Sequence, residues 1–133
     1  MRRTSLLKIQ ESAENYLETI HILLSRMGVV RSIDIVNELE YSKPSISIAM
    51  KNLREGGHIE MDSAGYITLT ESGRLIAEKM YERHTLLSNY LIALGVDEKT
   101  AVEDACRIEH VISEQSFEKI REHVGKRTES QHV

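Results

Sequence analysis

The sequence predicts a mainly α-helical fold in which one short β-hairpin interrupts a succession of helices. Hydrophobic residues make up 41% of the 133 residues but aromatic residues only 5%, so the core has to be built from aliphatic side chains. One proline and seven glycines leave few turns for a fold of many strands. Over most of the chain, apolar residues recur at the three- and four-residue spacing of an amphipathic helix.

The first half of the chain predicts three helices. An apolar stripe with helical spacing covers 11–27 and indicates the first of them. Ser32 is expected to be the N-cap of a short second helix, because a serine oxygen accepts a hydrogen bond from a backbone N–H of the first turn. Pro44 fits the first turn of a third helix, where its missing N–H is not needed. Ser42 or Lys43 then stands just outside that helix.

A hairpin and three more helices follow. Residues 58–61 and 66–69 predict two short strands joined by a turn that contains glycine. Thr70 is expected to cap a long helix that reaches Gly95. Two further helices fit 97–113 and 115–124. The predicted division of the chain is a first domain over 1–73, a second over 74–125 and a polar tail over 126–133.

Two short helices joined by a tight turn and followed by a hairpin make a winged helix-turn-helix, whose second helix enters the major groove of DNA. The net charge of −4 does not exclude DNA, because the first 54 residues lean basic and residues 97–118 lean acidic. Ile48 faces either the core or a thymine methyl, and we expect the core. The candidate DNA contacts are Ser42, Lys43, Pro44, Ser45, Ser47, Lys51, Arg54 and Tyr66. Plain helix capping is the competing interpretation for Ser45 and Ser47. For the whole motif, the competing interpretation is a set of helices and a hairpin that serve only as scaffold.

A second candidate site lies near the end of the chain. Glu109 and His110 come three and four positions after Cys106, so on a helix all three side chains share one face. A carboxylate, an imidazole and a thiolate are all metal ligands. Cys106 is the only cysteine and cannot form an internal disulfide, which fits a reducing cytoplasm. Taken singly, Cys106 is more often a small buried apolar residue than a ligand.

Five short stretches of the sequence resemble the iron-dependent and manganese-dependent repressors, the family of the diphtheria toxin repressor and the manganese transport regulator. The resemblance spans about residues 11–124 and rests on 14–20, 43–47, 69–73, 83–87 and 104–111. It implies a homodimer with an N-terminal DNA-binding domain and a helical metal-binding and dimerisation domain. The implied metal ligands are Glu18, His84, Cys106, Glu109 and His110. The surplus apolar residues that favour a dimer, unless they pack within the subunit, are Leu86, Leu87, Tyr90, Leu91, Leu94, Val111 and Ile112.

The chain departs from both branches of that family. Asn15 stands where the iron branch has a methionine ligand and the manganese branch an aspartate, and it offers only a neutral amide oxygen. Ser88 and Val102 replace two ligands of the iron branch's ancillary site, so one or two metals per subunit are both open. Cys106 is the iron-type residue, whereas Glu18 and the short two-domain length are manganese-type. A thiolate favours Fe²⁺, with Mn²⁺ as the alternative and Zn²⁺, Co²⁺ or Ni²⁺ as further occupants.

The expected function is therefore a cytoplasmic repressor that binds double-stranded operator DNA as a homodimer, with a divalent metal as corepressor. Two other interpretations stay open, a metallo-enzyme built on the same donors and a winged-helix regulator that ignores metal. No nucleophile and base are paired in the sequence, so we expect neither an enzyme nor a small-molecule substrate. No apolar run approaches the roughly 20 residues of a membrane span, and the basic start leads into no apolar signal segment.

Overall fold

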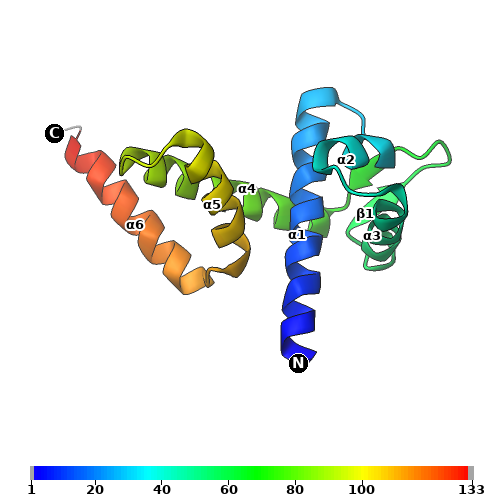
Figure 1. Cartoon of the computed structure of the whole chain (residues 1–133), viewed down its shortest axis with the longest axis horizontal. Helices are drawn as coiled ribbons and strands as arrows, with labels where there is room; N and C mark the ends of the chain where they lie inside the picture. Colours follow the sequence, from blue (N-terminus) through cyan, green and yellow to red (C-terminus); the bar gives the residue numbers. More distant parts are fainter. Residues whose placement is uncertain (1, 132–133) are drawn as a thin grey trace. The chain divides into compact units, whose positions relative to one another are not determined.

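The computed structural model describes the backbone of residues 2–131 and the side chains of residues 10–125. Within that range the elements run helix, helix, helix, hairpin, then three more helices (Figure 1). The chain divides into two compact units between Met80 and Tyr81, inside the fourth helix. The elements are α1 (Arg2–Met27), α2 (Ser32–Leu39), α3 (Lys43–Glu55), β1 (Ile59–Met61), β2 (Ile67–Leu69), α4 (Glu71–Ala93), α5 (Glu98–Val111) and α6 (Glu114–Gln131).

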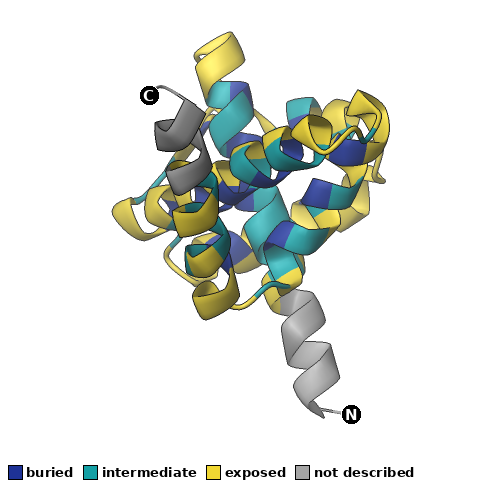
Figure 2. Cartoon of the chain, turned by 90° about the vertical axis from the view of Figure 1, so that its left-hand side faces the viewer, coloured by how far each residue is buried: buried dark blue, intermediate teal, exposed yellow. Residues whose placement is uncertain are grey.

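The first unit is a winged helix-turn-helix, as predicted. Helices α1, α2 and α3 bury one aliphatic core together with the hairpin. Its fully covered side chains include Leu17 and Ile20 on α1, Ile35 on α2 and Ile46 on α3, each 0% exposed. Figure 2 shows buried and exposed residues alternating along the helices, as expected when each helix buries one face. Burial, and then the neighbouring Tyr41, raise the pKa of Tyr16 on the same packing surface.

Helix α3 begins as its sequence predicts. Ser42 is the N-cap, and its Oγ accepts a hydrogen bond from the backbone N–H of Ser45 at 3.3 Å. Pro44 lies in the first turn, and Gly56 is the C-cap. Helix α2 differs from its prediction, because its N-cap is Arg31 and Ser32 is already helical. The Asp34 carboxylate accepts the backbone N–H of Arg31 at 2.9 Å, so the acidic third residue ties down this end in place of a serine.

The outward face of α3 corrects a second expectation. Ile46, Met50 and Leu53 are buried, but Ile48 is 62% exposed and does not join the core. The reason is the helical repeat. Positions 46, 50 and 53 lie on one face, whereas a residue two positions after Ile46 is rotated by about 200°.

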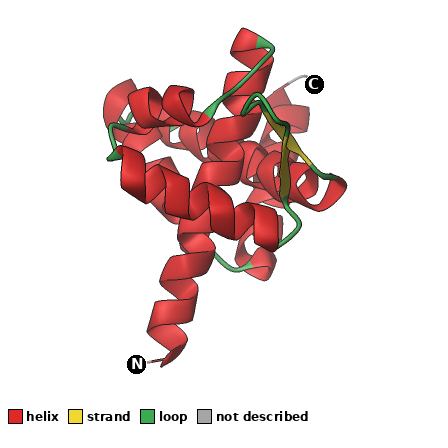
Figure 3. Cartoon of the chain, turned by 90° about the vertical axis from the view of Figure 1, so that its right-hand side faces the viewer, coloured by secondary structure: helices red, strands yellow, loops and turns green. Residues whose placement is uncertain are grey.

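The hairpin pairs β1 with β2 in antiparallel register, with Ile59 opposite Leu69 and Met61 opposite Ile67 (Figure 3). Ile67 N–H also donates to the carbonyl of Val30 at 2.8 Å, which attaches the hairpin to the α1–α2 connection.

Thr70 caps α4 as predicted, because its Oγ1 accepts the backbone N–H of Gly73 at 3.3 Å. Gly73 has to be glycine, since a Cβ there would lie 2.0 Å from the carbonyl oxygen of His58.

The second unit packs the later part of α4 with α5 and α6. Its small core consists of Leu87, Ala105 and Phe117, with partly buried aliphatic residues around it. Helix α6 continues to Gln131, beyond the predicted end at 124, because the glycine at 125 weakens a helix by only about 1 kcal/mol. Helix α1 likewise begins at Arg2, ahead of the predicted 11. No helix in the described part of the chain is both long and apolar enough to cross a membrane.

Candidate metal centre and nucleic-acid interface

The most deeply buried charged group of the second unit's described residues is the carboxylate of Glu109, which is 0% exposed. Helix α5, whose N-cap is Asp97, carries Glu109 in its last turn. Two imidazoles lie against this carboxylate. Nδ1 of His84, on α4, is 3.0 Å from Oε2, and Nε2 of His110 is 3.2 Å from Oε1. Because an ionised carboxylate is costly to bury without a counter-charge, these imidazoles or a cation have to compensate it.

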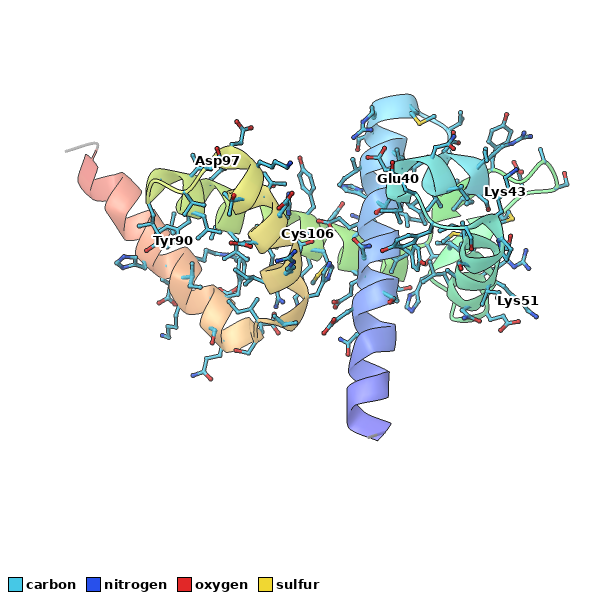
Figure 4. The ribbon with its side chains drawn as sticks, viewed as in Figure 1. Glu40, Lys43, Lys51, Tyr90, Asp97 and Cys106 are labelled. Carbon is cyan, nitrogen blue, oxygen red and sulfur yellow. The ribbon has the colours of Figure 1, made fainter. Side chains whose placement is uncertain are left out.

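Cys106 completes a group of donors on the same helix face. One ligand atom each from Cys106, Glu109 and His110 lies within 4.8 Å of the other two. Cys106 is half-buried and the His110 side chain is only 8% exposed, so the three donors are largely shielded from solvent. The structure thus brings together the three residues that the sequence places three and four positions apart. Figure 4 shows Cys106 on α5.

This donor set fits a divalent transition metal. A thiolate and imidazoles are the ligands of borderline-soft cations, and a carboxylate adds the negative charge that such a cation attracts. The burial of Glu109 supports a metal at this position. A buried carboxylate that faces two imidazole nitrogens carries a negative charge, and a bound cation would balance that charge. His84 is 24% exposed, which leaves the position accessible from solvent.

Arg83 is a residue that the sequence analysis missed. It is 5% exposed, and its Nη1 donates to the carbonyl oxygens of Glu109 at 3.0 Å and Ile112 at 3.1 Å. Its guanidinium carbon lies 5.3 Å from the centre of the Phe117 ring. The two carbonyls lie at the end of α5, where helix carbonyls lack partners within the helix. The arginine therefore fastens the turn that carries Glu109 and His110. Its only signal in the sequence was its place beside His84.

The other two residues of the predicted ligand set lie in the first unit, on α1. Glu18 is buried, at 5% exposed, and Asn15 is partly buried. The backbone carbonyl of Asn15 accepts the hydroxyl of Thr19 at 2.8 Å. In the second unit, Ser88 is buried one helical turn after His84, where a hydroxyl replaces the carboxylate of the iron branch.

The candidate DNA contacts are all exposed, and seven of the eight lie at or on α3. Ser42 is the N-cap of the helix, and the hydroxyl of Ser45 accepts a hydrogen bond from the Ser42 hydroxyl at 2.8 Å, so Ser45 takes part in the cap. Ser47 lies on an exposed position. Lys43 and Lys51 come from the same helix (Figure 4). A hollow of about 180 Å³ has Ser32, Ser47, Met50, Lys51, Arg54 and Met61 as its walls.

The residue before α2 adds a further cation, which lies against the hairpin. Tyr66 is 37% exposed, and the guanidinium of Arg31 lies 4.5 Å from the centre of its ring. Arg31 was not among the predicted contacts. The sequence shows that Arg31 is basic, but it does not show that Arg31 contacts the ring of Tyr66.

Known proteins resemble both the DNA-binding unit and the metal-binding unit of this chain. Residues 70–133 match the family described as "Iron dependent repressor, metal binding and dimerisation domain". The transcriptional regulator MntR of Escherichia coli O6:H1 is 33% identical over 112 residues, which are 84% of this chain and 72% of that protein.

Two solved structures share the fold. The first is a manganese-dependent transcriptional repressor in complex with manganese, with a TM-score of 0.76 and 27% identity over 85% of this chain and 52% of the other. The second is IdeR of T. acidophilum, with a TM-score of 0.73 and 26% identity over 84% of this chain and 53% of the other. The chain thus spans about half the length of these solved chains. It belongs to the family of iron- and manganese-dependent transcriptional repressors, with a winged helix-turn-helix followed by the family's helical metal-binding and dimerisation domain.

Proposed function

We propose that this protein binds operator DNA as a repressor and takes a divalent transition metal as its corepressor, acting in the cytoplasm through binding and not through catalysis. The observation that carries the proposal is the buried Glu109 carboxylate, with two imidazole nitrogens within 3.2 Å and a thiol on the same helix face. In the sequence, this donor group comes after a winged helix-turn-helix whose recognition helix, α3, exposes several cations.

The proposed ligands are His84, Cys106, Glu109 and His110, all of them residues of the second unit. Glu18 enters the ligand set from the family resemblance, and Asn15 is the weakest member because an amide oxygen is neutral. When bound, the cation supplies the positive charge that compensates the carboxylate and the thiolate. Glu109 orients both imidazoles, and Arg83 holds the backbone beneath Glu109.

We propose Fe²⁺ as the first candidate metal and Mn²⁺ as the second. The thiolate of Cys106 is a soft ligand, which favours Fe²⁺ over Mn²⁺. Manganese is supported as well, because one structural relative is a manganese-dependent repressor with bound manganese. Zn²⁺, Co²⁺ and Ni²⁺ are expected to bind in the test tube, because affinity follows the Irving–Williams order.

On the DNA side, α3 enters the major groove, and Lys43, Lys51 and Arg54 contact phosphates. All three are exposed on one helix, which suits a backbone contact that carries no sequence information. We place DNA binding in residues 1–73 and metal binding with dimerisation in 74–125. Two copies would present their α3 helices to half-sites about 34 Å apart.

The proposed homodimer needs an apolar surface in the second unit. Leu87 is buried within this unit, and Leu86 and Ile112 pack against the same core, so these three do not require a partner. Leu94 and Val111 remain exposed, at 57% and 67%, and they are the residues we assign to the dimer contact.

The metal part of the proposal is tested with a double variant, Glu109→Gln with His110→Gln, which removes two donors at similar volume. Its affinity for Mn²⁺ and for Fe²⁺ under anaerobic conditions is measured by calorimetry, and we expect a loss of at least about 100-fold. The matched control is Glu103→Ala with His123→Ala, because both of those side chains are exposed. Equal affinity in the two double variants would exclude this metal site.

The regulatory part is tested by selecting duplexes from a random-sequence library with the wild-type protein. Selections are run with Fe²⁺, with Mn²⁺ and with a chelator. We expect specific duplexes only in the presence of metal, and the metal that gives the larger gain in affinity is the corepressor. Equal enrichment with the chelator would make the protein a metal-independent regulator.

A further inference from the structure

Ile48 is a large apolar residue exposed at the middle of α3. Its side chain is 62% exposed, whereas Ile46 and Met50 beside it are 0% and 1% exposed. Helical geometry places Ile48 on the side opposite the buried stripe, about a turn away from Pro44, which is exposed as well. A single exposed isoleucine is unremarkable on most helices. On this helix it needs an explanation, because the other exposed side chains of the helix include cations that suit a DNA backbone.

The charges around Ile48 indicate what faces it. Lys43, Lys51 and Arg54 are exposed on the same helix and complement a phosphate backbone. Recognition helices read bases with residues of their N-terminal part, and Ile48 lies in the N-terminal half of α3.

The chemistry of the side chain restricts what Ile48 can read. Isoleucine has no hydrogen-bond donor or acceptor, so it cannot pair with the N7, O6, N4, N6 or O4 atoms of the base edges. The one apolar feature that a base pair presents in the major groove is the C5-methyl group of thymine. A cytosine at the same place would lose the methyl contact and bury an amino group without a partner.

We propose that Ile48 is a specificity-determining residue that selects thymine in each half-site of the operator through the C5-methyl group. This inference rests on the proposed DNA binding, and it adds a base preference that phosphate contacts cannot supply. Pro44, exposed on the same outward stripe, extends the apolar surface toward the helix N-terminus.

The test replaces thymine by deoxyuridine, which removes the methyl group and nothing else. Each thymine of a duplex selected from the random library is replaced in turn, and affinities are measured for the metal-loaded wild type and for Ile48→Ala. For wild type we expect about a fourfold loss at the contacted thymine, the value of one apolar carbon removed from water. Ile48→Ala should show no loss there, and Ile48→Val should restore most of it.

Two controls separate the proposal from a general loss of binding. Val29→Ala removes another exposed apolar side chain of the same unit, 57% exposed, and should keep the wild-type thymine profile. The slope of log affinity against log salt should be the same for Ile48→Ala and wild type, because phosphate contacts set that slope.

The outcomes are distinct. A deoxyuridine loss that disappears in Ile48→Ala supports the inference. An identical profile in wild type and Ile48→Ala, with sequence-specific binding intact, overturns the inference and leaves the proposed function standing. If no duplex is enriched with Fe²⁺, Mn²⁺ or chelator, the proposed function fails and the inference fails with it.

Discussion

Replacing Arg83 by methionine should destabilise the second unit by about 3 kcal/mol. The buried guanidinium makes hydrogen bonds to the carbonyls of Glu109 and Ile112, at 3.0 and 3.1 Å. Charge-assisted bonds of this kind contribute about 1.5–3 kcal/mol each. Methionine keeps most of the volume and a favourable contact with Phe117, and it removes the cost of burying a charge. The two bonds together contribute about 3–6 kcal/mol, and these gains offset part of that sum and leave about 3 kcal/mol.

The assay is urea unfolding of the metal-free protein, followed by circular dichroism. With a slope of about 1–3 kcal/mol per molar urea, the expected loss moves the midpoint down by about 1–3 M. The matched control is Arg74→Met. Arg74 makes an ion pair with Glu78 at 3.0 Å, but both side chains are about half exposed, so its loss should cost under about 1 kcal/mol.

The same substitution should weaken metal binding about 10- to 100-fold, because Arg83 holds the backbone of Glu109. If Arg83→Met unfolds at the same urea concentration as Arg74→Met, the two buried hydrogen bonds do not stabilise the unit, and the assignment of Arg83 as the anchor of α5 is wrong.

Three further predictions concern separate positions. Gly73→Ala should cost more than about 2 kcal/mol in thermal or urea unfolding, since a Cβ would lie 2.0 Å from the carbonyl oxygen of His58. Ser42→Ala should cost about 1 kcal/mol by losing the cap bond to the N–H of Ser45, again measured by unfolding. Cys106→Ser should lower the affinity for Zn²⁺ and Fe²⁺ more than the affinity for Mn²⁺ in calorimetric titrations, because the hard hydroxyl replaces a soft thiolate.

Each of these has its own control. A stable Gly125→Ala variant shows that alanine is tolerated where nothing lies within 4 Å, and an equally stable Gly73→Ala would contradict the close approach at Gly73. Ser42→Asp should keep the cap, so a loss in that variant too would mean that capping is not the cause. Uniform loss across the three metals in Cys106→Ser would show that the thiol does not select the cation.

Much of the local structure follows from short-range chemistry. The winged helix-turn-helix was predicted in part because Pro44 and a preceding serine mark the start of its recognition helix. The exceptions are equally local in cause. Ser32 lost the cap of α2 to Arg31 because Asp34, three positions on, supplies the carboxylate. Ile48 was expected in the core, but the helical repeat turns it outward.

For the metal centre, the sequence by itself determined the group on one helix. Spacings of three and four residues bring Cys106, Glu109 and His110 to one face wherever that helix packs. Only the tertiary structure decided that His84, 25 positions before Glu109, points its Nδ1 at the Glu109 carboxylate, because this depends on how α4 and α5 pack. The same packing buries Arg83 against the end of α5, which no periodicity in the sequence signals, since hydrogen bonds to a distant backbone leave no pattern in the residue order.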